Sequence, residues 1–175
     1  MSNHTDSTQH DSHKQLWEVR QSGIHNNGLF AKSFIPAGNY IIEYLGERIE
    51  KEVSRKRALE WEAKAREKGE GLVYIFELNE KYDLDGNIEN NPAKYANHHC
   101  EPNTEAVNCD HSIWFVAVRD IQSGEEITFD YGYAIDSFLD HPCVCGAPSC
   151  PGYIVRRDQR WRVKRLLNQR RTAVS

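Results

Sequence analysis

Short β-rich runs separated by turn signals dominate the first half of the chain. Residues 16–20, 28–32 and 40–45 are such runs, and Asn-Gly and Pro-Ala-Gly sequences break them. Further strands are predicted at 72–78, 113–119 and 125–129, with a turn at 83–86. The run 113–119 is apolar on both faces, which is typical of a central strand. This pattern predicts a mainly β fold of small, twisted sheets with short helices (α+β).

Residues 47–68 have a different pattern, which predicts a helix with a solvated charged face. Acid–base pairs recur four residues apart with the acid first, the favourable order on a helix, and they are Glu47/Lys51, Glu52/Lys56, Glu60/Lys64 and Glu62/Arg66. Gly69 and Gly71 then end the helix. Val53, Leu59 and Trp61 are available for packing.

The two ends of the chain differ in composition. Residues 1–14 are polar without apolar periodicity, so they are predicted to form a flexible arm whose histidines are solvated or, alternatively, bind a metal. Residues 153–175 contain eight Lys or Arg against Asp158 alone, a net charge of +7. Because the whole chain carries −4, the rest carries −11.

This charge asymmetry bears on partners. An acidic body suits a basic protein or peptide substrate, and the basic tail is able to contact nucleic acid or an acidic protein. Alternatively, residues 156–175 form a basic terminal helix that packs through Trp161, Val163 and Leu166 or Leu167 and keeps its arginines in water.

Length and cysteine content restrict the class of protein. The 175 residues predict one domain plus tails. The sequence has no apolar run near the roughly 18 residues of a membrane span and no secretory signal pattern. A soluble intracellular protein of the cytoplasm or nucleus is therefore expected, without membrane contact. Five cysteines in a reducing compartment favour metal binding over disulfides.

Three motifs concentrate the chemistry. The stretch Asn97-His98-His99-Cys100-Glu101-Pro102-Asn103 is followed by Glu126-Ile127-Thr128-Phe129-Asp130-Tyr131 and then by Cys143, Cys145 and Cys150. The order N-H-x-C-x-P-N, E-x-T-F-D-Y and C-x-C-x4-C resembles the SET domain of protein lysine methyltransferases, including its zinc-binding post-SET segment. The stretches 27–31 and 42–47 are similar to two earlier motifs of that family.

The resemblance covers about residues 17–153 and implies the domain organisation. Residues 15–135 would form the SET domain, 136–155 the post-SET zinc segment, and 156–175 a basic helix or tail. It also implies a knot-like threading of the C-terminal part of the SET domain. The chain departs from the family pattern at Asn26, Lys94 and His99, where glycine, arginine and serine are common.

The cysteines predict a zinc site. A C-x-C pair with a third cysteine a few residues later can supply three ligands from one loop. The resemblance supplies Cys100 as the fourth, so the predicted ligands are Cys100, Cys143, Cys145 and Cys150, with Cys109 left over. Such a zinc would be structural, because four thiolates leave no open position for water. Buried reduced thiols, or His99 or His141 in place of one cysteine, are the alternatives.

The resemblance implies S-adenosylmethionine as the methyl donor. Its predicted binding residues are Asn26, Asn27, Gly28, Leu29, Phe30, Asn97, His98 and Tyr131. Gly28 permits close approach of a ligand to the backbone, and asparagine tolerates left-handed backbone conformations. Taken alone, an Asn-His pair before a Pro-Asn turn is more often engaged in local hydrogen bonds.

Methyl transfer to lysine requires a neutral amine in a narrow aromatic channel. The candidate channel residues are Tyr74, Phe129 and Tyr133, and the predicted catalytic residues are Tyr131 and Tyr74. The resemblance places the Tyr131 hydroxyl near the methyl group and the target nitrogen, where positioning suits it better than general base catalysis. It also implies that phenylalanine at 129 permits more than one methylation, although Phe129 is equally suited to the core.

Two functions follow. The first is a protein-lysine N-methyltransferase that acts on histone tails or other basic proteins. The second is a catalytically silent, zinc-containing SET module that binds protein or nucleic acid. The joint presence of Gly28, Asn97, His98 and Tyr131 favours the enzyme.

Overall fold

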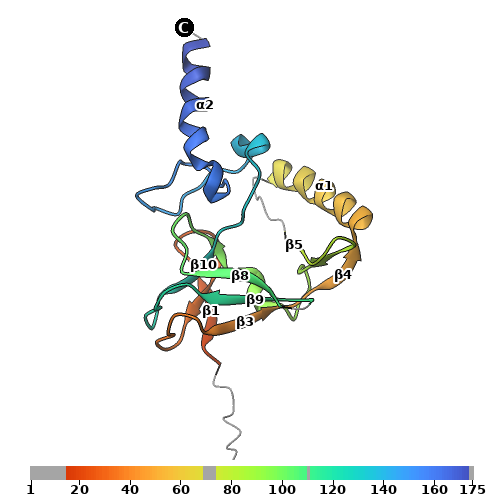
Figure 1. Cartoon of the computed structure of the whole chain (residues 1–175), viewed down its shortest axis with the longest axis vertical. Helices are drawn as coiled ribbons and strands as arrows, with labels where there is room; N and C mark the ends of the chain where they lie inside the picture. Colours follow the sequence, from red (N-terminus) through yellow and green to blue (C-terminus); the bar gives the residue numbers. More distant parts are fainter. Residues whose placement is uncertain (1–14, 69–73, 110, 174–175) are drawn as a thin grey trace, which may run out of the picture.

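Three small sheets form the body of the computed structural model, with one long helix beside them and a second that projects away from them (Figure 1). The structure describes residues 15–68, 74–109 and 111–173. The elements in chain order are β1 (Trp17–Gln21), β2 (Asn27–Ala31), β3 (Tyr40–Tyr44), β4 (Glu47–Glu50), α1 (Lys51–Lys68), β5 (Ile75–Glu77), β6 (Tyr82–Asp85), η1 (Pro92–Tyr95), β7 (Asn97–His98), β8 (Thr104–Cys109), β9 (Ser112–Ala117), β10 (Glu126–Phe129), η2 (Ile135–Asp140), η3 (Arg157–Gln159) and α2 (Arg160–Ala173). The predicted mainly β fold class is confirmed.

The first sheet brings two of the sequence motifs together. Its strand order is β1-β2-β10-β7, in which β10 is antiparallel to β2 and parallel to β7. Thr128 is paired with Asn97, and Phe129 with His98. The short strand of the N-H-x-C motif therefore lies directly beside the E-x-T-F-D-Y strand.

The second sheet supplies most of the core. Its order is β3-β9-β8, so the run predicted to be a central strand is central. Ile113 and Phe115 of β9 are buried in a large cluster that extends from Leu29 of β2 to Phe129 of β10. Apolar positions on both faces of β9 fit this central position, because each face packs against protein.

The third sheet, with the order β4-β6-β5, corrects two predictions. Residues 47–50 form strand β4 rather than the first turn of a helix, because Ile49 is buried between exposed Arg48 and Glu50. Residues 82–85 form strand β6 rather than a turn. The turn lies at residues 79–81, where Asn79 Oδ1 accepts hydrogen bonds from the backbone amides of Lys81 and Tyr82 at 3.0 and 2.8 Å.

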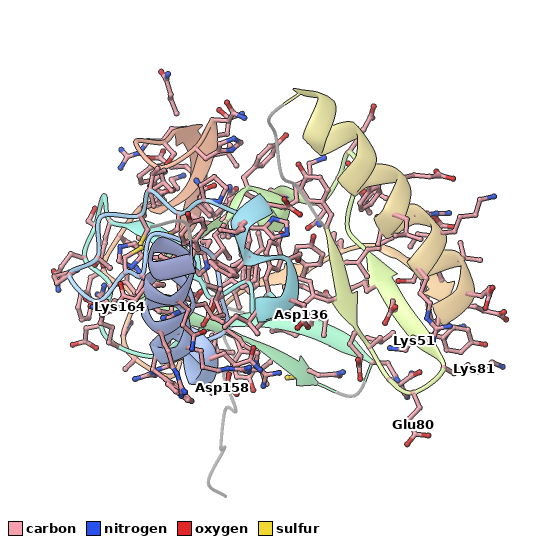
Figure 2. The ribbon with its side chains drawn as sticks, turned by 90° about the horizontal axis from the view of Figure 1, so that it is seen from above. Lys51, Glu80, Lys81, Asp136, Asp158 and Lys164 are labelled. Atoms are coloured by element: carbon pink, nitrogen blue, oxygen red, sulfur yellow. The ribbon has the colours of Figure 1, made fainter. Side chains whose placement is uncertain are left out.

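Helix α1 covers the third sheet through ion pairs. Lys51 Nζ lies 2.6 Å from Asp83 Oδ1, and Arg57 Nη1 lies 2.6 Å from Asp85 Oδ2. Both aspartates are buried residues of β6. Figure 2 shows Lys51 beside the hairpin whose tip carries Glu80 and Lys81. The predicted helix stop at Gly69 and Gly71 falls outside the described residues, as does the predicted arm 1–14.

The C-terminal segment has its own small core. Val163 of α2 is fully buried with Ile135, Phe138 and Val155, and Leu166 and Leu167 pack against this cluster. Trp161 is 66% exposed, so the prediction that it packs down is wrong. It lies two residues from Val163, and a side chain at that spacing does not share its face of a helix. Within the described residues, no helix has the length and apolar character needed to span a membrane.

Candidate functional site

A cavity of about 590 Å³ lies where the loop before β2, helix η1 and strand β7 meet Tyr131. This volume is within the range of small-molecule sites. Its lining residues are Gln21, His25, Asn26, Asn27, Tyr74, Lys94, Tyr95, Asn97 and Tyr131. The structure thus brings together five predicted site residues from four separate parts of the chain: Asn26, Asn27, Tyr74, Asn97 and Tyr131.

The loop before β2 is held in shape by Asn97. The Asn97 Nδ2 group donates to the carbonyl oxygens of His25 at 3.2 Å and Asn27 at 3.1 Å. Asn26 has a φ of 39°, in the left-handed region that asparagine tolerates better than most residues. This asparagine therefore takes the backbone conformation for which glycine is common in the family pattern.

Glu126 is a site residue that the sequence reasoning missed. Its carboxylate accepts hydrogen bonds from Asn97 Nδ2 at 2.7 Å and from Ser22 Oγ at 2.8 Å. It also lies against Gly28, where an added Cβ would be 2.4 Å from Glu126 Oε1. A side chain at position 28 would therefore displace the Glu126 carboxylate. The available signal was its place as first residue of the E-x-T-F-D-Y motif.

Gly28, Leu29 and Phe30 are buried in β2. Leu29 belongs to the large core cluster, and the guanidinium of Arg20 lies over the Phe30 ring at 3.9 Å. These three predicted cofactor residues are not among those that line the cavity, whereas Asn26 and Asn27, directly before them, are.

Tyr131 is fixed at both ends. Its backbone amide donates to His98 Nδ1 at 3.2 Å, and its hydroxyl donates to the Ala96 carbonyl at 3.2 Å. Burial raises the pKa of Tyr131 well above its ordinary value, and neighbouring Tyr133 and Tyr74 raise it further. The phenol is therefore neutral at pH 7, which is consistent with positioning rather than base catalysis.

His98 connects Tyr131 to the cysteine cluster. Because Nδ1 accepts from the Tyr131 amide, the proton of the neutral imidazole lies on Nε2, which is 3.5 Å from Cys100 Sγ. The side chain is buried, with both ring nitrogens engaged within the protein. It acts as a bridge between two parts of the site.

The predicted channel residues lie in different surroundings. Tyr74 lines the cavity, and its ring packs edge-on against Trp61 of α1 at 5.9 Å. Tyr133 lies beside Tyr131, with ring centroids 5.6 Å apart. Phe129 is buried in the large core, 4.7 Å from Phe115 and 4.8 Å from Tyr131 between ring centroids. Phe129 thus has both a core role and contact with the candidate catalytic ring.

The four predicted zinc ligands are brought together. The sulfur atoms of Cys100, Cys143, Cys145 and Cys150 all lie within 4.8 Å of one another, with Cys100 and Cys143 at 3.9 Å. Tetrahedral zinc with bonds of about 2.3 Å would separate its sulfur ligands by roughly 3.8 Å. Cys109 is apart from them at the end of β8, where its sulfur lies 3.8 Å from the Tyr40 hydroxyl.

Protein groups donate hydrogen bonds to three of the four sulfurs. The backbone amides of Cys100 and Gly152 donate to the sulfurs of Cys145 at 3.5 Å and Cys150 at 3.3 Å. A hydrogen bond from the Cys100 thiol lowers the pKa of Cys143 to about 3, and the same bond raises the pKa of Cys100. The donor set and its spacing fit a structural zinc ion.

Arg160 is a second residue whose position sequence reasoning missed. The basic end of the chain was predicted to keep its arginines in water, but the Arg160 side chain is only 11% exposed and lies between the N-H-x-C turn and Asp130. The other described arginines with this expectation, Arg156, Arg157, Arg162 and Arg165, are exposed. Nothing in the local charge pattern distinguishes Arg160 from them.

Known sequences place this arrangement in context. The family model of the SET domain matches residues 26–132. The chain is 38% identical over 156 residues to histone-lysine N-methyltransferase trr of Drosophila melanogaster, which covers 84% of the chain and 6% of that protein. It is 37% identical over 140 residues to the H3 lysine-4 specific histone-lysine N-methyltransferase of Saccharomyces cerevisiae, which covers 77% and 13%. The chain thus spans only a small part of either relative.

Proposed function

The chain belongs to the SET-domain family, and on this premise we propose that it is a protein-lysine N-methyltransferase that uses S-adenosylmethionine. The observation that carries this proposal is the cavity in which Asn26, Asn27 and Asn97 meet Tyr131 and Tyr74. Polar groups for a cofactor and aromatic groups for a lysine side chain thus share one space. The names of the relatives, which are histone-lysine N-methyltransferases, support the same reaction.

The residues present fit the cofactor. The side-chain amides of Asn26 and Asn27 and the side-chain carbonyl oxygen of Asn97 offer polar partners. The Lys94 ammonium group offers a cation to a carboxylate. Asn97, with Glu126 behind it, fixes the loop that would hold the ligand. S-adenosylmethionine, when bound, supplies the electrophilic methyl group.

The aromatic side chains prepare the lysine. Only a neutral amine is a nucleophile, and removing its proton at pH 7 from a pKa of about 10.4 costs roughly 4 to 5 kcal/mol. A channel walled by Tyr74, Tyr131 and Tyr133 disfavours the charged form and so reduces this cost. The channel also limits the directions from which the amine approaches.

Tyr131 orients the reacting groups. Its hydroxyl proton is directed at the Ala96 carbonyl, so its oxygen lone pairs remain available to polarised hydrogens in the cavity. Since burial keeps the phenol neutral, the hydroxyl holds the amine and methyl group in line without removing a proton.

The zinc ion of this proposal is structural. Cys100, Cys143, Cys145 and Cys150 would hold it, and no coordination position would remain for water. Its effect on the reaction would pass through Cys100 to His98 and the Tyr131 amide. The metal would thereby join the post-SET segment to the site.

The substrate is a basic protein, with histone tails as the first candidate. A net charge of −11 on residues 1–152 attracts Lys- and Arg-rich segments by electrostatic steering. The histone-directed names of the relatives support this choice. A histone substrate would make the nucleus the place of action.

Helix α2 offers a second contact, with nucleic acid. Trp161, Lys164 and Arg165 are exposed at positions i, i+3 and i+4, so they share one face of α2. Phosphate contacts by Lys164 and Arg165 would give affinity for duplex DNA that falls steeply with salt concentration. Fluorescence anisotropy with a labelled duplex at increasing salt tests this contact, and affinity that does not change with salt would contradict it.

The deciding experiment compares wild type with Tyr131→Phe, using radiolabelled S-adenosylmethionine on core histones and on a whole-cell lysate. Wild type labels protein lysines, and Tyr131→Phe loses at least about 100-fold in turnover while its cofactor affinity changes less than about threefold. Tyr40→Phe, an exposed tyrosine of β3, is the control with wild-type turnover. A wild-type protein that binds zinc but neither binds the cofactor nor labels any protein would instead establish the silent module.

A further inference from the structure

We infer that Arg160 is a positioning residue that holds Asp130 and Tyr131 against the N-H-x-C turn, which contains Cys100. This inference rests on the proposed methyl transfer. The Arg160 guanidinium donates from Nη2 to Asp130 Oδ2 at 2.6 Å, from Nη1 to the Cys100 carbonyl oxygen at 2.5 Å, and from Nε to the Val155 carbonyl oxygen at 2.8 Å. All three nitrogens are therefore engaged. The side chain is 11% exposed.

The three acceptors come from three separate parts of the chain. Asp130 directly precedes Tyr131, Cys100 is a member of the cysteine cluster, and Val155 follows the post-SET loop. A guanidinium is planar and its donors point in fixed directions, so three simultaneous hydrogen bonds fix the relative positions of their acceptors. Arg160 thus sets the position of the catalytic strand end relative to the N-H-x-C turn.

Asp130 transmits this constraint to Tyr131. While Oδ2 accepts from Arg160, Oδ1 accepts from the Gly132 amide at 3.1 Å, across the turn whose central residue is Tyr131. Oδ1 also lies 3.7 Å from His98 Nδ1, the atom that accepts the hydrogen bond from the Tyr131 amide. Without Arg160, the Asp130 carboxylate, with 24% side-chain exposure, would lose its cation. The turn at Tyr131 would then lose the ion pair that holds Asp130 in place.

The docking of α2 does not depend on Arg160 alone. Val163 is fully buried against Ile135, Phe138 and Val155, and Leu166 and Leu167 pack on the same cluster. Loss of the guanidinium should therefore leave α2 in place while the site loosens. This separates positioning of the site from mere attachment of the helix.

Steady-state kinetics of Arg160→Gln, Arg160→Lys and Arg162→Gln test the inference, with Arg162 as the exposed neighbour on the same helix. Arg160→Gln is expected to lower kcat about 10- to 100-fold while KM for the cofactor changes less than about threefold. Arg160→Lys is expected to retain only part of kcat. It keeps the positive charge, but its ammonium group cannot reach three divergent acceptors with fixed geometry. Arg162→Gln keeps the wild-type kcat. A wild-type kcat for Arg160→Gln would overturn the inference.

Hydrogen exchange gives a readout that does not depend on activity. In Arg160→Gln the amides of Tyr131 and Gly132 should exchange at least about fivefold faster, while protection of residues 160–167 stays at the wild-type level. If wild type transfers no methyl group, the proposed function fails, and these exchange rates still decide whether Arg160 fixes the turn. Unchanged exchange at Tyr131, or loss of protection throughout α2, would overturn the positioning role.

Discussion

The body of the molecule and its C-terminal segment are stabilised in different ways. Residues 15–130 contain all three sheets and the large core cluster around Phe115 and Leu29. Among the described residues beyond Asp130, the paired β structure is the bridge between Pro142 and Tyr153, and the buried cluster has four residues, Ile135, Phe138, Val155 and Val163. So small a core does not stabilise a segment on its own.

This difference assigns separate tasks to the two regions. The body holds the cavity through backbone ladders and the hydrogen bonds of Asn97 and Glu126. The C-terminal segment contacts the body through the cysteine cluster, through Arg160 and through a hydrogen bond from Ser149 Oγ to Glu101. The cysteine cluster and Arg160 both involve Cys100. Tyr131 lies at the junction of the regions. We therefore expect metal loss to affect turnover far more than it affects the sheets.

The largest effect should come from removing a proposed zinc ligand. Cys143→Ser is expected to lose zinc and to lower methyl transfer at least about 100-fold, because ligand loss releases the post-SET loop from Cys100. Cys109 lies outside the cluster, so Cys109→Ser is the matched control and should keep both its zinc and its methyl transfer activity. Metal analysis and the transfer assay measure the two quantities. Full zinc content in Cys143→Ser would contradict the assigned ligand set.

Gly28→Ala should disturb the body side of the cavity. Its Cβ would lie 2.4 Å from Glu126 Oε1 and 2.9 Å from a Phe30 ring carbon, so Glu126 must move and release Asn97. We expect the Kd for S-adenosylmethionine to rise about 10- to 100-fold, or about 1.4 to 2.7 kcal/mol, by calorimetric titration. Gly23→Ala, with open space at its Cβ, should change it less than about twofold. Equal affinities of the two variants for S-adenosylmethionine would show that Glu126 does not support cofactor binding through Asn97.

Arg57→Gln should destabilise the body without touching the site. It leaves the buried Asp85 carboxylate, 4% exposed, without its cation, which should lower the free energy of unfolding by about 2 kcal/mol. Arg55→Gln, where Arg55 is 76% exposed and paired with exposed Glu52, should change it by less than about 0.5 kcal/mol. Urea unfolding measures both. A matching loss in the two variants would show that the Asp85 pair contributes nothing specific.

The smallest expected effect is on the product of the reaction. Phe129 contacts the Tyr131 ring, so a hydroxyl added there would crowd the amine end of the channel. Wild type is expected to add more than one methyl group, and Phe129→Tyr to accumulate monomethyl-lysine at nearly wild-type stability. Mass spectrometry of the product resolves the two outcomes. An unchanged distribution of methylation states would leave Phe129 with its core role only.

The sequence predicts those parts of the fold and site that depend on local pattern. Strand β9 is recognisable because both its faces are apolar, and the cysteines are recognisable by their spacing. Strand β4 cannot be recognised in this way, because Glu47 and Lys51 continue the acid–base spacing of the helix. The burial of Ile49 is the feature that distinguishes the strand. At residues 47–50, burial of one apolar side chain therefore decides the secondary structure against the local charge pattern.

Contacts between distant residues are beyond such reasoning. Arg160 meets Cys100 across 60 positions and Asp130 across 30, and it is one of several arginines in a basic run. Exposure of Trp161 follows from the rotation of α2 that buries Val163, which is set by tertiary packing. Both features depend on how α2 docks, and no local pattern encodes that docking.

Hydrogen exchange of the whole protein with and without a zinc chelator shows whether the two regions are stabilised separately. We expect chelation to increase exchange in residues 143–167 and at the Tyr131 turn, while β2 and β9 keep their protection. Exchange that rises equally in β2, β9 and α2, or that does not change anywhere, would contradict the claim that a metal-held segment completes a site carried by an independently stable body.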